Sequence, residues 1–435
     1  MMIALSVSSL QSCINEKMDC PPDVPENEDG IHLRFTIMTK TDGRTRAADI
    51  DGDQEGSGYE NYLDINDIRY LIFDNNQRFI TDITPDAKTV AANSAYTVYN
   101  VEAKVSDQYF YDNLTGYVDF YILALANHSG WGISIPELKR GDNIQTLFSN
   151  GLVMTETPVT SRLQAALSDG GQKFPMSGLQ HFRVPGNMLM TSASGSPYDL
   201  SLATGKELNM LRALAKIEII DKINIADGAV FNEATDNQGL NGRLRIDKVE
   251  INGFMTGGSL LPAYTQWNRN SVFETQQVIA PTIPTSARYV LPPVLDADNN
   301  FGPNDGLSGY IIDFIEDDYA RSLRQDKCPV FSGYIYEYLK TSNQMAGVPV
   351  TQQPYFRVTT RGYTTPEGVV EAESLVLPVR MAQYTNGSAT SADNLPQLLR
   401  NHIYRFEIAG IGSNLELVVT VCPRAEFTTD VPTFE

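Results

Sequence analysis

The most regular feature of this chain is the alternation of apolar and polar residues in IHLRFTIMTK, residues 31–40. The apolar positions are Ile31, Leu33, Phe35 and Ile37. Successive side chains of a β-strand point to opposite faces, so this period of two predicts a strand with one buried face.

Short runs of aromatic and β-branched residues continue this pattern through the first half of the chain. Residues 65–83, INDIRYLIFDNNQRFITDI, place two such runs around DNNQ and predict a hairpin, because Asp and Asn favour tight turns. Residues 96–105 and 116–127 predict further strands. The segments 135–150 and 161–170 are typical of short helices inserted between strands.

The second half has the same style, with strand-like runs broken by turns as far as residues 415–423. It begins at LNMLRALAKIEIIDKI, residues 208–223, whose β-branched end predicts a strand, although its first part is also compatible with a helical turn. Short strands separated by turns favour antiparallel sandwiches over alternating strands and helices. The sequence therefore predicts an all-β fold of two tandem antiparallel β-sandwich domains, residues 31–207 and 208–435, with short helical insertions.

The length and charge of the chain limit the number of domains and the classes of partner that we expect. A chain of 435 residues is too long for one ordinary core, which agrees with two domains. Its 53 acidic and 33 basic residues give a formal net charge of −20. So acidic a surface repels phosphate backbones, and we expect no nucleic-acid partner. The simplest role of the charge is solubility.

The start of the chain predicts an exported lipoprotein. The first ten residues form an apolar run as long as a signal-peptide core, although no basic residue precedes it. Leu10 and Ser12 supply the apolar and small positions that a lipoprotein signal peptidase needs ahead of Cys13. We expect residues 1–12 to be a signal peptide, Cys13 to carry lipid, and the acidic, Pro-rich residues 13–30 to form a tether.

Catalytic motifs are missing from the sequence. There is no nucleophile elbow, metalloprotease helix, P-loop or dinucleotide glycine pattern. The four histidines are His32, His128, His181 and His402. They lie in or beside predicted strands, where a solvated or hydrogen-bonded ring is the usual role. We expect neither an enzyme nor a cofactor.

One acidic loop has the oxygen spacing of a calcium site. Asp49, Asp51, Asp53 and Glu60 approach that spacing, but Gln54 stands where the sharp turn needs Gly. A solvated loop is therefore the favoured interpretation, and no metal site is expected.

The four cysteines, at positions 13, 20, 328 and 422, form no C-x-x-C pair and have no zinc spacing. A disulfide between Cys328 and Cys422 is chemically permitted outside the cytosol. Their spacing does not decide whether they pair, because it does not establish proximity.

Several segments stand in a fixed order along nearly the whole chain. They are the lipoprotein start followed by MDCPP, IHLRFTI, TRA, IRYLIFDNNQRFI, YILALANHSG, FPMSGL, LRALAKIEIID and LLRNHIYRFEIAGIG. Taken together, they resemble the fimbrillin-type proteins of Bacteroidales, the subunits of type V pili. The resemblance implies two transthyretin-like β-sandwich domains and export as an outer-membrane lipoprotein.

The resemblance also implies assembly by strand exchange. In that scheme an arginine-specific protease cuts the loop after the first strand, here between Arg46 and Ala47, with Arg44 as second choice. Loss of the strand opens a groove, which a strand from the next fimbrial subunit fills. We expect a structural or adhesive subunit of a cell-surface fimbria, in an accessory or tip position. Its expected partners are other fimbrial subunits, the outer membrane through the lipid on Cys13, and a ligand on a host or bacterial surface.

Three alternatives stay open. An anchor subunit would keep both its first strand and the lipid on Cys13. A surface lipoprotein that binds glycan would stack sugars on some of the 21 tyrosines or on Trp131 and Trp267. An enzyme is the least supported class, because the sequence shows no recognisable nucleophile, general base or set of metal ligands.

Overall fold

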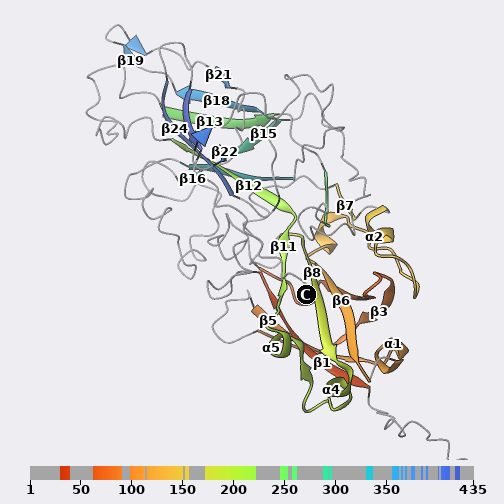
Figure 1. The fold of residues 1–435 in the computed structure, drawn as a ribbon. Helices are drawn as coiled ribbons and strands as arrows, with labels where there is room; N and C mark the ends of the chain where they lie inside the picture. Colours follow the sequence, from red (N-terminus) through yellow and green to blue (C-terminus); the bar gives the residue numbers. More distant parts are fainter. Residues whose placement is uncertain are drawn as a thin grey trace, which may run out of the picture.

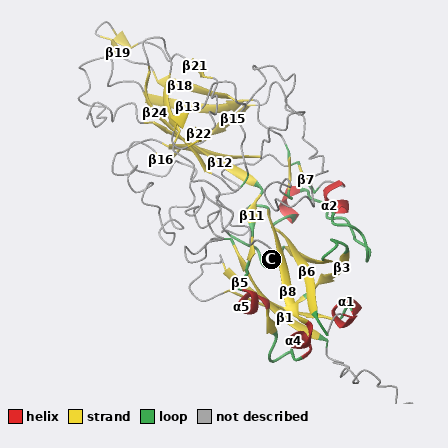
Figure 2. Ribbon diagram, viewed as in Figure 1, coloured by secondary structure: helices red, strands yellow, loops and turns green. Residues whose placement is uncertain are grey.

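The computed structural model describes residues 30–39, 62–90, 98–112, 115–149, 152–155, 172–221, 245–252, 257–261, 288–291, 293–295, 330–336, 355–361, 364–365, 368–369, 374–377, 384–385, 388–389, 400, 403–411 and 417–421. Strands dominate these residues, and the few helices are short (Figures 1 and 2).

The first half of the chain forms two five-stranded sheets. The first sheet contains β1 (Ile31–Met38), β4 (Pro85–Val90), β5 (Val98–Val105), β9 (Tyr198–Asp199) and β10 (Leu208–Asn209). The second sheet contains β2 (Ile68–Asp74), β3 (Phe79–Ile83), β6 (Tyr117–Ala126), β8 (Met176–Pro185) and β11 (Leu211–Arg212). The strand orders are β10–β1–β5–β4, with β9 also paired to β1, and β11–β8–β6–β2–β3.

Short helices connect these strands. They are α1 (Gln108–Asp112), α2 (Gln145–Ser149), α4 (Gly186–Met190), α5 (Leu200–Thr204) and the 3-10 helix η3 (Ser129–Trp131). Helix α2 lies within the segment 135–150 for which a helix is predicted, whereas α4 and α5 have no counterpart among the predicted elements. The predicted helix at 161–170 falls outside the described residues. Within the part of the chain that the structure describes, no helix is long and apolar enough to span a membrane.

The two sheets of the first half share one aromatic core. Phe35 on β1 meets Tyr70 on β2 edge-on, with the ring centroids 5.7 Å apart. On the same core, the Phe110 ring lies 5.2 Å from Phe120, which lies 5.9 Å from Phe182. All five rings are fully buried. The apolar faces of the two sheets therefore pack against each other, as in a β-sandwich.

The second half contains another pair of sheets (Figure 1). One sheet contains β12 (Leu214–Asp221), β16 (Pro293–Leu295), β17 (Val330–Tyr336), β24 (Ile403–Ile411) and β25 (Leu417–Val421). The other contains β13 (Arg245–Asn252), β15 (Arg288–Leu291), β18 (Tyr355–Arg361) and β21 (Ser374–Leu377). Three two-stranded pairs complete the described strands: β7 (Val153–Met154) with β14 (Gly258–Ser259), β19 (Thr364–Thr365) with β20 (Gly368–Val369), and β22 (Tyr384–Thr385) with β23 (Ser388–Ala389).

Polar contacts tie the segment that contains β14 to the first half. Strand β14 pairs with β7 in antiparallel fashion. The Ser177 hydroxyl, on β8, donates to the Leu260 carbonyl at 2.9 Å. The buried Arg400 guanidinium donates to the same carbonyl at 2.8 Å and to the Ser259 carbonyl at 2.9 Å. Leu260 therefore joins a strand of the first half to a residue near the end of the chain.

The all-β sandwich prediction is confirmed by these sheets. The predicted hairpin at 65–83 is formed by β2 and β3, with Gln77 at a φ of 62° in its turn. Most pairings are antiparallel, but β1 pairs with β9 and β10, and β12 with β24, in parallel. Strands β10 and β11 still pair with first-half strands, so the chain leaves the first two sheets after Arg212. The domain boundary at residue 208 stays a prediction.

The core position of β1 gives a stability prediction. Leu33 on β1 is fully buried, whereas Leu202 on α5 is 84% exposed. We expect Leu33→Ala to lower the free energy of unfolding by about 2–5 kcal/mol, because it removes buried methyl groups and leaves a cavity. The matched substitution Leu202→Ala should change it by less than about 0.5 kcal/mol. Urea unfolding of the full chain, followed by circular dichroism, measures both; equal effects would contradict the placement of β1 in the core.

Candidate functional site

Strand β1 lies inside its sheet and is paired along both edges. On one edge it pairs with β5 in antiparallel fashion at all eight positions, from Ile31 opposite Val105 to Met38 opposite Val98. On the other edge it pairs in parallel with two short strands, β9 and β10. A strand at the N-terminal end of the described chain is thus a central strand of the first sheet (Figure 1).

The inward face of β1 is wholly excluded from solvent. The inward residues are Ile31, Leu33, Phe35 and Ile37, and each has 0% exposure. Burying one such side chain is worth about 1.5–3 kcal/mol, so the four together contribute roughly 6–12 kcal/mol. That is comparable with the whole stability of a typical domain, which is about 5–15 kcal/mol. The first sheet pair therefore depends on having a strand in this position.

The outward face of β1 makes polar cross-strand contacts with β5. The Arg34 guanidinium Nε lies 2.9 Å from Oε1 of Glu102, and the Thr36 hydroxyl donates to Oδ1 of Asn100 at 3.1 Å. The Arg34 side chain is 39% exposed, and such ion pairs contribute little to stability, about 0–1 kcal/mol. The apolar face, rather than this pair, holds the strand.

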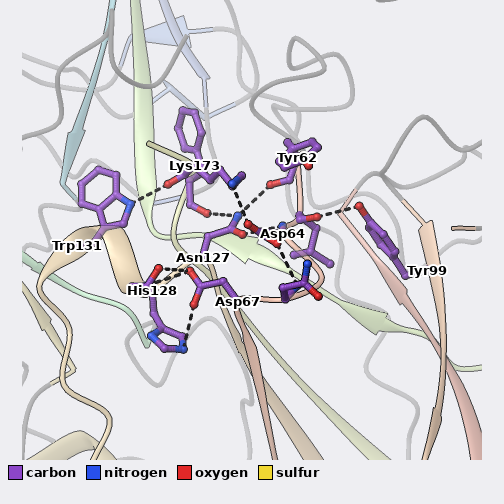
Figure 3. Close-up of polar contacts among 12 residues, drawn as sticks. Tyr62, Asp64, Asp67, Tyr99, Asn127, His128, Trp131 and Lys173 are labelled. Atoms are coloured by element: carbon purple, nitrogen blue, oxygen red, sulfur yellow. Dashed lines mark hydrogen bonds and ion pairs between the residues drawn. The ribbon is translucent and has the colours of Figure 1, made fainter. Parts of the chain in front are cut away.

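A buried asparagine, Asn127, holds residues 62–64 in place (Figure 3). The Asn127 side chain accepts from the Asp64 amide at 2.8 Å and donates to the carbonyls of Tyr62, at 2.9 Å, and Phe174, at 2.7 Å. Asn127 directly follows β6 and is 2% exposed, with a left-handed φ of 55°. Asparagine tolerates this conformation better than most residues, which suits it to the position.

Further contacts reinforce this Asn127 cluster. The Tyr99 hydroxyl, on β5, donates to the Leu63 carbonyl at 2.8 Å. The Lys173 ammonium lies 2.8 Å from Oδ2 of Asp64. Burial raises the pKa of Asp64, but the Lys173 ammonium and the Asn66 amide outweigh burial and hold that pKa below its ordinary value. Residues 62–64 are thus bonded to both sheets of the first half.

One neighbouring group has the residues of a catalytic triad but not its order. The Ser129 hydroxyl donates to Oδ2 of Asp67 at 2.8 Å, and Nε2 of His128 lies 3.4 Å from Oδ1 of the same carboxylate. In a triad the imidazole stands between the hydroxyl and the carboxylate. Here the carboxylate stands between them, so the imidazole is not placed to activate the serine. Burial lowers the pKa of His128, although Asp67 opposes the shift.

Two other residues that the sequence analysis considered, His181 and Trp131, have structural roles. The His181 ring lies tilted against Tyr121, with ring centroids 4.8 Å apart, and its Nε2 lies 3.3 Å from Asp119; burial lowers the pKa of His181. Trp131 is fully buried and donates to the Lys173 carbonyl at 2.7 Å, so it cannot stack on a sugar. In the described part of the chain, no group of three His, Cys, Asp or Glu side chains could hold a metal ion.

The residues predicted for lipidation and cleavage lie outside the described residues. These residues are Cys13, Arg46, Ala47 and the alternative site Arg44, and their roles stay predictions. The acidic residues from Asp49 to Glu60 also lie outside the described residues, as do Cys328 and Cys422, whose pairing the sequence leaves open. The sequence analysis missed Asn127, although an Asn that closes a strand before a His-Ser-Gly turn is a signal for a left-handed position.

No protein-family model matches this sequence, and no curated protein matches it. Among solved structures, the chain is similar to the tip fimbrial protein Mfa3 from Porphyromonas gingivalis with a C-terminal truncation, at 12% identity and a TM-score of 0.41, covering 90% of this chain and 99% of that one. It is also similar to a fimbrial assembly protein from Parabacteroides distasonis, at 10% identity and a TM-score of 0.40, covering 90% and 94%. These neighbours are fimbrial proteins of Bacteroidales, the kind of protein that the sequence motifs resemble.

The Asn127 cluster gives a second prediction. Asn127→Ala removes the acceptor of the Asp64 amide and the donor of two carbonyls, and we expect it to cost about 2–4 kcal/mol of unfolding free energy. Asn127→Asp keeps the acceptor but places a buried carboxylate oxygen against the carbonyls of Tyr62 and Phe174, so it should cost at least as much as the alanine variant.

The matched control for this series is Asn66→Ala, because Asn66 is exposed. It should change the free energy of unfolding by less than about 0.5 kcal/mol. Urea unfolding compares the four proteins. A wild-type value for Asn127→Ala would show that the cluster does not hold residues 62–64.

Proposed function

We propose that this protein is a subunit of a cell-surface fimbria that assembles when a strand from another subunit takes the place of β1. The observation that carries the proposal is the setting of β1, which is paired on both edges and buried on one face. The sequence predicts a loop after this strand, and one cut in that loop would divide the strand from the residues that follow it. Its position could then be filled by a strand of the same alternating pattern.

The energetics require replacement rather than simple loss. Removing β1 would expose the apolar core and the edge of β5, and roughly 6–12 kcal/mol of burial would be lost. A sandwich with that vacancy would be close to its limit of stability and would expose an unpaired edge. An incoming strand with apolar residues at alternate positions restores both the ladder and the burial. Filling the vacancy therefore has a favourable driving force, whereas direct exchange of β1 for an equivalent strand is close to neutral in free energy.

The Asn127 cluster supports cleavage upstream of residue 62. Its bonds join residues 62–64 to Tyr99 on β5 and to Asn127 and Phe174 near the second sheet. These bonds do not pass through β1, so they would hold the new N-terminal segment against the fold after a cut between Arg46 and Ala47. The strand could then leave without unravelling β2.

We further propose export as a lipoprotein through Cys13, with the mature subunit at the cell surface. The support is the spacing of Leu10 and Ser12 before Cys13 and the acidic, Pro-rich segment 13–30. Lipid on the cysteine would deliver the chain to the outer membrane. A cut after Arg46, followed by replacement of β1, would then separate the folded part from this lipid.

Cleavage is tested with an arginine-specific protease on the full chain. We expect one early cut, whose larger product begins at Ala47, while the fragment containing β1 stays bound in native conditions because its core face is buried. Native and denaturing mass spectrometry distinguish the bound fragment from a released one. Arg46→Ala should slow this cut at least about tenfold, whereas the matched Arg44→Ala should not.

Two results would contradict the exchange proposal. One is an early cut elsewhere in the wild type that Arg46→Ala leaves unchanged. The other is a cut protein that neither forms oligomers nor takes up an added strand after the β1 fragment is displaced.

An anchor subunit that keeps β1 is the second candidate, and the same burial of β1 favours it, because an uncut strand completes the sandwich. The two candidates differ in whether the mature subunit keeps its lipid.

Fractionation of cells tests the lipid on Cys13. Cys13→Ala should move either subunit from the membrane fraction to the soluble fraction of cells, with Cys20→Ala as matched control. In cells that contain the protease, a processed subunit loses its lipid and leaves the membrane, whereas an anchor stays. Unchanged fractionation of Cys13→Ala would remove the lipoprotein proposal.

A further inference from the structure

The edge of β1 opposite β5 is held by an unusual set of acceptors. The N–H groups of a strand leave its two edges alternately, so His32 and Thr36 share one edge. The His32 amide donates to the Ser192 hydroxyl oxygen at 2.9 Å, and the Thr36 amide donates to the Ser201 hydroxyl oxygen at 2.9 Å. Two side chains therefore do what a neighbouring strand usually does with its carbonyls.

These two serines alternate with the two short strands. Strand β9 pairs with β1 at Leu33 and Arg34, between the two serine contacts, and β10 pairs at Ile37 and Met38, beyond the second. Along the edge, the order is thus Ser192, β9, Ser201 and β10. We call the two serines, Ser192 and Ser201, the serine wall.

Local structure fixes both hydroxyls. Ser192 follows helix α4, and its hydroxyl donates to the Leu189 carbonyl at 2.6 Å, which leaves its lone pairs to accept the His32 amide. Ser201 lies in helix α5, whose first turn is capped by the Asp199 carboxylate accepting from the Leu202 amide at 2.9 Å. Both serines are almost fully buried, so water does not readily replace them.

We propose that the serine wall is the main-chain recognition element for whichever strand fills the β1 position. It deepens the function proposed above and rests on it. The occupant it fits is an extended segment from another subunit with apolar residues at alternate positions and free N–H groups at its second and sixth residues. A proline at either place is excluded, because it has no N–H to donate.

The serine wall and the apolar face act on different groups of an incoming strand. The apolar face requires apolar side chains, and the serine wall requires N–H groups. A shift of one residue would turn the apolar side chains outward, so the core already forbids it. A shift of two residues keeps the apolar face inward and presents other N–H groups to the same hydroxyls. The hydroxyls therefore require N–H groups on this edge but do not distinguish even registers, and large side chains such as Phe35 against Tyr70 make that distinction.

The first test follows individual amides in the uncut full chain. Residue-resolved hydrogen exchange should show the His32 amide exchanging about tenfold faster in Ser192→Ala, and the Thr36 amide about tenfold faster in Ser201→Ala. Each variant should leave the other amide protected.

Neighbouring threonines supply the controls. The Thr191 hydroxyl donates to the Met188 carbonyl at 2.8 Å, and the Thr204 hydroxyl donates to the Leu200 carbonyl at 2.7 Å. Thr191→Ala and Thr204→Ala remove a hydroxyl from the same two helical regions without removing an acceptor of β1. Both amides should keep their wild-type exchange rates in these controls.

The second test uses the full chain cut after Arg46 and a labelled synthetic peptide of residues 30–39. The unmodified peptide should displace the β1 fragment, and N-methylation at position 32 or 36 should weaken its binding about tenfold. In Ser192→Ala, the penalty of methylation at position 32 should shrink while that at position 36 stays, and Ser201→Ala should show the reverse.

The outcomes separate this inference from the proposed function. If the cut wild-type chain takes up no unmodified peptide, strand exchange fails and the inference fails with it. If that peptide binds but methylation has no effect, or the serine variants behave like the threonine controls, the inference alone is overturned. Coupling between each serine and its own amide position supports it.

Discussion

The seating of β1 between β5 and the short strands β9 and β10 is the interaction on which the first half of the structure depends. This strand occupies a central position in the first sheet, and its Phe35 packs in the aromatic core against Tyr70. Its residues are the first that the structure describes, yet they form a central strand whose apolar face is fully buried. A strand of the same apolar pattern in this position would recover the same burial, and the proposed strand replacement rests on that.

The contacts around β1 divide into two kinds with different consequences. Burial of the apolar face contributes several kcal/mol to stability, and any strand with apolar residues at alternate positions provides it. This burial therefore supplies most of the affinity for a strand in the β1 position. The contacts of Ser192 and Ser201 with backbone amides are worth less each, but a buried amide without an acceptor is costly, so they supply selection. The exposed pair of Arg34 and Glu102 contributes little to either. Separately, the Asn127 cluster keeps residues 62–64 attached to both sheets.

Much of the fold could be predicted from period-two patterns, because burial of one face is written into the order of residues. The hairpin of β2 and β3 followed from its apolar runs and DNNQ turn, and β1 from four alternating apolar residues. Helices α4, α5 and α2 have five residues each, too few for a readable helical period, so the sequence missed α4 and α5 and predicted a much longer helical segment around α2. Asn127 was missed because its role depends on carbonyls of Tyr62 and Phe174, which lie 65 and 47 residues away in the chain.

The sequence by itself determined that Ile31–Met38 is a strand with one apolar face, because side-chain alternation is a local property of the backbone. It also supplied the lipoprotein start and the arginines that lead to the cleavage hypothesis. Only the tertiary structure decided that this strand is central rather than at an edge, and that two serines about 160 residues later accept its amides. Strand neighbours and hydroxyl acceptors are set by long-range packing, which leaves no periodic trace in the local order of residues.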